Sequence, residues 1–139
     1  MKVAIVFDTH TGITAAAAEK IAELVRRGGH ECSAESVSNA DPRTVARADA
    51  VVIGCWTKGW FVVRQHPSDG ALAFVEKLSL NGRPVAVFAT YRLAVGRTVT
   101  KLANAVEAAG GTVTGMYSVK GPNVPAGFDR WVESLGGPA

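Results

Sequence analysis

Residues 3–14, VAIVFDTHTGIT, contain a wholly apolar strand and the polar turn that follows it. A strand without alternating polar residues is typical of a parallel sheet that helices cover on both faces. The turn leads into residues 14–27, where apolar side chains recur at helical spacing from Ala17 to Val25. This strand–turn–helix unit predicts an α/β protein whose ligand site lies at the carboxyl ends of its strands.

Strands and helices alternate along the rest of the chain in the same way. Apolar runs predict strands at 3–7, 50–55 and 84–89, and two more polar segments, 30–37 and 112–119, are expected to be strands as well. Helices are predicted at 14–27, 41–47, 68–78, 95–109 and 128–135. Strands joined by helices lie parallel, because such crossovers are right-handed and too long for a hairpin. The sequence therefore predicts a three-layer α/β/α sandwich around a five-stranded parallel sheet, with residues 30–37 at or near its edge.

The length and composition of the chain fit one domain over residues 1–139. Its 139 residues are 47% hydrophobic, which is enough to build a core without disulfides or metals. No apolar run approaches the ~20 residues needed to cross a bilayer, and Asp8 ends the first run before it could serve as a signal peptide. We therefore expect a soluble, cytoplasmic protein that does not bind a membrane.

Charge and cysteine content argue against other kinds of site. The formal net charge of +3 comes from dispersed basic residues without a long cationic run, so nucleic acid is not an expected partner. Cys32 and Cys55 have no CxxC or Cys/His spacing, so neither a disulfide framework nor a metal site is predicted. Both cysteines are expected to be small core residues.

The turn after the first strand has the chemistry of a phosphate site. A helix N-terminus offers unpaired N–H groups and the positive end of its dipole, glycine allows close approach, and threonine hydroxyls can donate. The turn carries neither GxxxxGK[ST] nor GxGxxG, the signatures of nucleotide-binding loops. The other interpretation is that its threonines only cap the helix. The residues expected to hold a phosphate are Thr9, His10, Thr11, Gly12, Ile13 and Thr14.

This turn resembles the phosphate loop of the flavodoxins, which holds the phosphate of FMN. The pattern T-x-T-G-x-T at residues 9–14 carries the resemblance, and residues 39–42, 50–55 and 80–84 also resemble stretches of short-chain members. The likeness covers nearly the whole chain. It implies the flavodoxin-like strand order 2-1-3-4-5, FMN bound without a covalent link, and no catalytic residues of the protein's own.

Two later turns are expected to hold the ring of FMN. Residues 54–59, GCWTKG, match the form G-C-x-x-x-G of short-chain flavodoxins, which implies that the Lys58–Gly59 peptide turns its carbonyl toward the ring N5 on reduction. Residues 89–96 resemble the second ring loop, with Tyr91 as the stacking aromatic. The expected ring contacts are Trp56, Thr57, Lys58, Gly59, Trp60, Thr90, Tyr91, Arg92 and Leu93.

The ring turns depart from the family in charge and aromatic content. Flavodoxins usually carry acidic residues directly after the glycine, whereas this chain has Trp60 and Phe61 there, and Arg92 and Arg97 follow the fourth strand. Aromatic side chains can stack on the flat ring. Because basic residues replace acidic ones, we expect a less negative potential for the second one-electron reduction, and redox partner proteins with an acidic docking face.

Other functions stay open on the sequence alone. The chain could be a non-redox docking module, or a small FMN-dependent oxidoreductase acting on a quinone or a biosynthetic intermediate, with Arg64 and His66 at its mouth. Whether it is an enzyme is therefore undecided, with electron transfer between partners favoured. A receiver domain would need an aspartate at the end of the third strand, and a cobalamin site needs DxHxxG where residues 8–12 are DTHTG.

Overall fold

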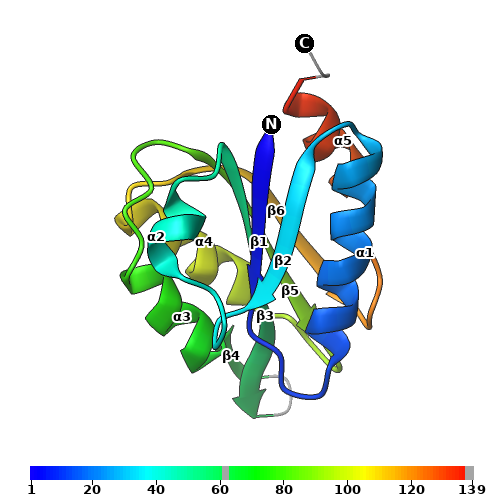
Figure 1. The fold of residues 1–139 in the computed structure, drawn as a ribbon. Helices are drawn as coiled ribbons and strands as arrows, with labels where there is room; N and C mark the ends of the chain where they lie inside the picture. The colour runs from blue at the N-terminus through cyan, green and yellow to red at the C-terminus, as the bar shows by residue number, and fades with distance from the viewer. Residues whose placement is uncertain (61–62, 137–139) are drawn as a thin grey trace.

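The computed structural model describes residues 1–60 and 63–136, which form a sheet covered by helices on two sides (Figure 1). The strands are β1 (Lys2–Phe7), β2 (Glu31–Ser36), β3 (Ala50–Trp60), β4 (Val63–Pro67), β5 (Pro84–Tyr91) and β6 (Thr112–Lys120). The helices are α1 (Ile13–Arg27), α2 (Pro42–Ala46), α3 (Asp69–Glu76), α4 (Thr98–Ala108) and α5 (Phe128–Ser134). Within the described ranges, no helix has the length and apolar character needed to cross a membrane.

Five strands form a parallel sheet in the order β2-β1-β3-β5-β6. These are the five predicted strands, so the α/β sandwich and the order 2-1-3-4-5 are confirmed. The apolar runs of β1, β3 and β5 lie in the middle of the sheet and are buried. β2 is an edge strand, as its polar sequence indicates. The parallel strands end on the lower side of Figure 1, and this is the end at which the site is expected.

Two apolar clusters lie on the opposite faces of the sheet. On one face, Ile5 and Val52 pack with apolar residues of α1 and α5. On the other face, Val6 and Ile53 pack with apolar residues of α2, α3 and α4. Successive residues of a strand point to opposite faces, so each central strand must be apolar throughout. This double burial fixes the register of the strands and therefore the positions of the turns that follow them.

The chain after residue 55 is a hairpin where the sequence predicts a long loop. β3 continues to Trp60, and β4 returns beside it as an antiparallel strand, with Lys58 opposite His66. A shift in the pairing between Lys58 and Trp60 marks a bulge at Gly59. This sixth strand lies off the parallel sheet. The sequence does not predict it, because no Asn-Gly or Asp-Gly pair marks a tight turn here.

The sequence predicts the first residue of α2 correctly, but not that of α4. Asp41 caps α2 and Pro42 is its first residue, as predicted. Helix α4 begins at Thr98, later than the predicted start at Val95. Gly96 has a φ of 53°, which lies outside the helical region, so the regular helix starts after it. The residues before Thr98 are thereby left as a turn at the end of β5.

Candidate functional site

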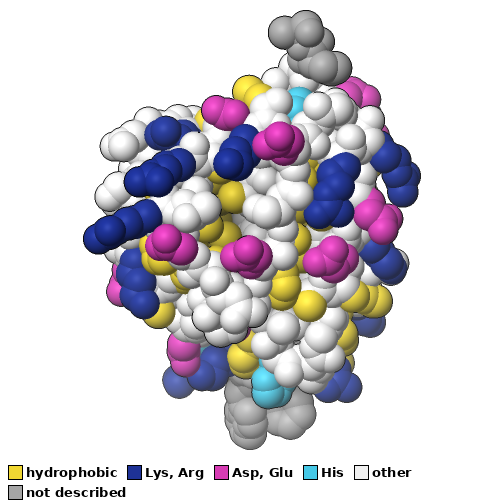
Figure 2. Space-filling view, viewed as in Figure 1, with side chains coloured by type: hydrophobic (Ala, Val, Ile, Leu, Met, Phe, Trp, Pro, Cys, Tyr) yellow, Lys and Arg dark blue, Asp and Glu magenta, His cyan; other side chains and the backbone are white. Residues whose placement is uncertain are grey.

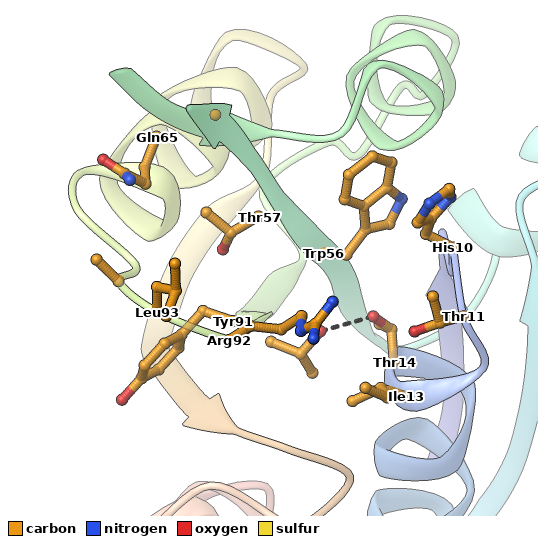
Figure 3. Close-up of a pocket in the computed structure, with 13 residues that line it drawn as sticks. His10, Thr11, Ile13, Thr14, Trp56, Thr57, Gln65, Tyr91, Arg92 and Leu93 are labelled. Atoms are coloured by element: carbon orange, nitrogen blue, oxygen red, sulfur yellow. Dashed lines mark hydrogen bonds between the residues drawn. The ribbon is translucent and has the colours of Figure 1, made fainter. Parts of the chain in front are cut away.

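A cavity of about 430 Å³ opens at the carboxyl ends of the parallel strands (Figure 3). Three segments build it, namely the β1–α1 turn, the β3–β4 hairpin, and the end of β5 with the turn that follows. The same three regions are predicted from the amino-acid sequence. The lining residues are His10, Thr11, Ile13, Thr14, Trp56, Thr57, Gly59, Gln65, Thr90, Tyr91, Arg92, Leu93 and Ala94.

Two residues predicted to hold a phosphate shape the β1–α1 turn and are not in the lining. The Thr9 side-chain oxygen accepts hydrogen bonds from the N–H groups of Gly12, at 3.1 Å, and Ala15, at 3.4 Å. Gly12 precedes α1 with a φ of 88°, a conformation that glycine adopts at little cost. Ile13 and Thr14 both line the cavity, so the unpaired N–H groups of the α1 N-terminus stand at its edge.

Thr14 and Thr90 join the first turn of α1 to the end of β5. Their side-chain oxygens lie 2.7 Å apart, and both residues are buried (dashed line in Figure 3). Either hydroxyl can be the donor. Because only one of the two hydroxyl protons lies between these oxygens, the other proton is left for a further acceptor. Both residues line the cavity, where an oxygen of a bound ligand would be such an acceptor.

An aromatic stack connects the β1–α1 turn to β3. The ring centroids of His10 and Trp56 lie 4.8 Å apart, and the ring planes differ by 26°. His10 is exposed and Trp56 is half-buried, and the two rings stand side by side in Figure 3. The stack holds the Trp56 indole as part of the cavity wall, and offset stacking of this kind is a favoured aromatic arrangement.

Lys58 and Gly59 have different roles in the hairpin. Lys58 is outside the lining, and its Nζ lies 2.7 Å from Oδ2 of Asp69. The hydrogen bond from Lys58 and its positive charge lower the pKa of the Asp69 carboxyl. Gly59 lines the cavity and packs against β4, because a Cβ there would lie 3.0 Å from the carbonyl oxygen of Arg64 and 3.0 Å from Cα of Gln65. Any side chain at this position would push β4 away.

The turn after β5 supplies a wall with an exposed apolar residue. Tyr91 is half-buried, and Leu93 is 67% exposed. In Figure 3, Tyr91 and Leu93 lie on one side of the cavity, and the Arg92 side chain extends from there toward the side on which Thr14 lies. Flat apolar groups could therefore pack on this wall and still be reached from outside the protein.

Two lining residues, Gln65 and Ala94, are not predicted from the sequence. Gln65 is 5% exposed and belongs to β4, the strand that the sequence does not predict. In the sequence, Gln65 is marked only as an uncharged amide shortly after an apolar run. Its burial depends on the β3–β4 hairpin. Ala94 has no side-chain chemistry that would mark it. The predicted ring contact Trp60 lies outside the residues whose side chains the structure describes, as does the neighbouring Phe61.

The described lining of the cavity contains no carboxylate. Its ionisable side chains of basic character are His10 and Arg92. The charge of Lys58, close by in the hairpin, is paired with Asp69. Within residues 1–60 and 63–136, no group of three histidine, cysteine or acidic residues is placed to hold a metal ion. The site therefore favours a ligand that is anionic at one end.

The chain matches the family model described as Flavodoxin over residues 5–134. It is similar to the two-electron reduced flavodoxin of Megasphaera elsdenii, with 25% identity, a TM-score of 0.74, and coverage of 89% of this chain and 88% of that chain. A Streptococcus pneumonia TIGR4 flavodoxin matches with 20% identity, a TM-score of 0.75, and coverage of 97% of each chain. A Fusobacterium nucleatum flavodoxin mutant bound to flavin mononucleotide matches with 16% identity, a TM-score of 0.64, and coverage of 81% of this chain and 67% of that chain.

The matches below 25% identity support the fold, whereas the family model covers both the sheet and the segments that line the cavity. It confirms the resemblance first seen at residues 9–14, and with it FMN as the cofactor. By its strand order, the position of its cavity and this match over most of its length, the chain belongs to the flavodoxin family.

Proposed function

We propose that this chain is an electron carrier that uses FMN to pass electrons between redox partner proteins. The observation that supports this most is the combination of groups in one cavity. A helix N-terminus without a carboxylate stands at one end, and a wall with Tyr91 and the exposed Leu93 stands at the other. A phosphate ester with a flat ring suits this arrangement, and a partner could approach the ring at the open wall.

The residues present fit FMN. A volume of about 430 Å³ falls within the roughly 300–1,000 Å³ of typical cofactor sites. The Thr57 hydroxyl oxygen is buried in the lining, and it has no hydrogen-bond partner among the described residues. A ligand in the cavity would supply the partner that buried polar groups normally have. At the other end, no atom lies within 4 Å of the position that a Cβ of Gly12 would take, so the turn has room beside it.

Each part of the lining has a role that its chemistry supports. His10, Thr11, Ile13 and Thr14 would hold the phosphate, together with the N–H groups at the start of α1. Trp56, Thr57 and Gly59 would hold one side of the ring, and residues 90–93 the other. When bound, FMN supplies the one-electron redox chemistry, which needs no acid or base from the protein. The protein's own part is to bind, orient and partly shield the cofactor.

The charge around the cavity favours a partner with an acidic docking face. Arg64, Arg92 and Arg97 are exposed and belong to or flank the lining segments, whereas Lys58 is paired with Asp69. Figure 2 shows Lys and Arg side chains at the lower end of the molecule, the end where the strands finish in Figure 1. Opposite charges on two docking faces speed their encounter and select the right partner.

The visible absorption spectrum of the purified protein, followed by titration of the colourless form with FMN, tests the proposal. An electron carrier should be yellow or become so with one equivalent of FMN, and should not oxidise NAD(P)H by itself. A protein that binds no FMN would instead be a docking module. Oxidation of NAD(P)H by the protein alone would favour the oxidoreductase interpretation.

The salt dependence of electron transfer tests the docking charge. Oxidation of the reduced protein by the anionic reagent ferricyanide should slow as ionic strength rises, and oxidation by the cationic cobalt hexaammine should quicken. Arg97→Glu should weaken both trends. Arg43→Glu, on α2 and outside the cavity lining, is the matched control and should leave them nearly unchanged. Opposite trends in the wild type would contradict an acidic partner.

A further inference from the structure

The β3–β4 hairpin, which lines one side of the cavity, is bonded to α4 through its main chain. Nζ of Lys101 donates a hydrogen bond of 3.0 Å to the main-chain carbonyl oxygen of Gln65, in a partly buried contact. Lys101 belongs to α4 and Gln65 to β4, and these two elements pack against each other. A hydrogen bond from an ammonium group is stronger than one between neutral groups. A single lysine therefore joins a helix to a strand that lines the cavity.

Lys101 makes this bond to a carbonyl oxygen and does not pair with a carboxylate. Among residues 1–60 and 63–136, the ion pairs join Arg27 to Glu23 and Lys58 to Asp69. The described lining of the cavity does not include Lys101 either. The contact that the structure gives its ammonium group is therefore the one with β4, and a direct contact with a ligand in the cavity is not its role.

Two glycines bring the main chain close to the same point of β4. The position of a Cβ on Gly59 lies 3.0 Å from the carbonyl oxygen of Arg64 and 3.0 Å from Cα of Gln65. The position of a Cβ on Gly96 lies 2.8 Å from Cβ of Gln65. β3 and the turn after β5 thus pack closely on the residue whose carbonyl oxygen Lys101 binds. Because Gly59 and Gln65 both line the cavity, a shift of β4 at this point would change the shape of the cavity.

The backbone of Arg64 adopts a conformation that needs support from its surroundings. Its φ of 57° lies in the left-handed region that residues other than glycine rarely enter. Such a conformation is costly for a residue with a side chain and persists only where surrounding contacts hold it. The bond from Lys101 reaches the carbonyl oxygen of the very next residue, from outside the hairpin. Without this bond, the chain at Arg64 has less to oppose a return to an ordinary strand conformation, and β4 would move.

We propose that Lys101 is a positioning residue, which holds β4 in place from α4 and so sets the shape of the cavity before a ligand binds. The inference rests on the proposed FMN site, but it concerns a residue outside the cavity lining. A site that is already ordered binds its ligand more tightly, because less ordering remains to be done on binding. Loss of the Lys101 bond should therefore loosen β4 in the FMN-free protein and weaken FMN binding indirectly.

Amide hydrogen exchange in the FMN-free protein tests whether Lys101 holds β4. Lys101→Met keeps a long side chain but removes the ammonium group, so the β4 amides should exchange roughly threefold to tenfold faster than in the wild type. The amides of the central strand β1 should change little, because the opening is local. Lys101→Arg keeps the charge and can donate to the same carbonyl oxygen, so it should lie closer to the wild type. Lys77→Met, which removes an exposed lysine at the end of α3, is the matched control and should exchange like the wild type.

Titration with FMN and with riboflavin, which lacks the phosphate, tests how Lys101 affects the site. If Lys101 acts by holding the hairpin, Lys101→Met should lower both affinities by the same factor, roughly twofold to tenfold. That factor should persist at high ionic strength. A lysine that attracted the phosphate through its charge would instead affect FMN alone, and salt would screen the effect. Lys77→Met should change neither affinity, and Lys101→Arg should recover part of both.

The outcomes distinguish this inference from the proposed function. A wild type that binds no FMN would overturn the FMN site, and hydrogen exchange would still decide whether Lys101 holds β4. Equal exchange of the β4 amides in the wild type and Lys101→Met would overturn the role of Lys101. A loss of affinity for FMN that riboflavin does not share would also overturn it, as would a Lys101→Arg variant that behaves like Lys101→Met. Faster exchange at β4, an equal loss of both affinities and recovery in Lys101→Arg would support it.

Discussion

The side-chain oxygens of Thr14 and Thr90 lie 2.7 Å apart, so the first turn of α1 and the end of β5 share a buried hydrogen bond. The two residues are far apart in the sequence, and both line the cavity. Removal of one hydroxyl leaves the other buried without this partner, which costs more than a typical hydrogen bond contributes. The end that would hold the phosphate and the wall that would hold the ring are therefore coupled.

Thr14→Val should lower the free energy of unfolding by about 1–2 kcal/mol, because the Thr90 hydroxyl loses its partner. Thr98→Val is the control. The Thr98 hydroxyl is also buried but has no partner among the described residues, so its removal should be neutral or stabilising. Urea unfolding of the FMN-free protein measures both variants. Equal losses would argue against the threonine pair.

Trp56→Ala should weaken FMN binding about threefold to tenfold, because aromatic stacking contributes ~0.5–1.5 kcal/mol beyond the burial of area. His10→Ala should weaken it less, since this change keeps the Trp56 indole and removes the imidazole that stacks on it. Quenching of FMN fluorescence measures both affinities. If Trp56→Ala binds FMN as tightly as the wild type, the indole does not contact the ring.

Gly59→Ala should destabilise the protein and weaken FMN binding. The added Cβ would meet the backbone of Arg64 and Gln65 at 3.0 Å, so β4 would have to move. Gly121→Ala is the matched control, because Gly121 also has a positive φ, of 100°, but its Cβ would meet nothing within 4 Å. Thermal unfolding and FMN titration should show a larger loss for Gly59→Ala. If the two variants lose stability and FMN affinity to the same extent, the loss comes from backbone strain alone and the contact between Gly59 and β4 has no effect.

Stability should fall at alkaline pH because of the cysteines. Burial raises the pKa of the Cys55 thiol from 9.0 to about 12, and that of Cys32 to about 11. Above a pH of about 9 the unfolded chain releases thiol protons that the folded chain keeps, so this stabilisation is complete below pH 9 and is lost as the pH rises toward 12. From a pH of about 8 to about 10, Cys55 should account for a loss of about 1 kcal/mol.

Cys55→Ala isolates the contribution of the Cys55 thiol to the pH dependence of stability, whatever effect the change has on packing at neutral pH. Its free energy of unfolding, measured in urea at each pH, should fall less steeply above a pH of about 9 than that of the wild type. Parallel curves for the two proteins would show that the Cys55 thiol titrates no differently in the folded and unfolded chains.

The parallel sheet is predictable because its pattern is local. Residues 3–7, 50–55 and 84–89 are apolar throughout, and only strands covered on both faces need that pattern. Asp41 and Pro42 likewise mark a helix start through their own chemistry. The β3–β4 hairpin is different, because contacts with residues distant in sequence fix it. Gly96 and Lys101, which hold Gln65, carry no sign of that contact in the sequence.

The candidate site is predictable to a similar extent. The turn at residues 9–14 and the ends of β3 and β5 can be located from the strand order. The interaction partner of each side chain cannot be predicted, because it depends on which residues of other elements lie nearby. The Thr9 oxygen accepts from the turn's own N–H groups, and Lys58 pairs with Asp69 of α3. Neither pairing leaves a pattern in the sequence.

A crystal structure of the protein with FMN tests the central claim most directly. We predict that the phosphate lies at the N-terminus of α1, within hydrogen-bond distance of residues 10–14, and that the ring lies between the β3–β4 hairpin and the turn after β5. FMN bound elsewhere on the protein, or lying with its phosphate at the Leu93 end of the cavity, would contradict the account.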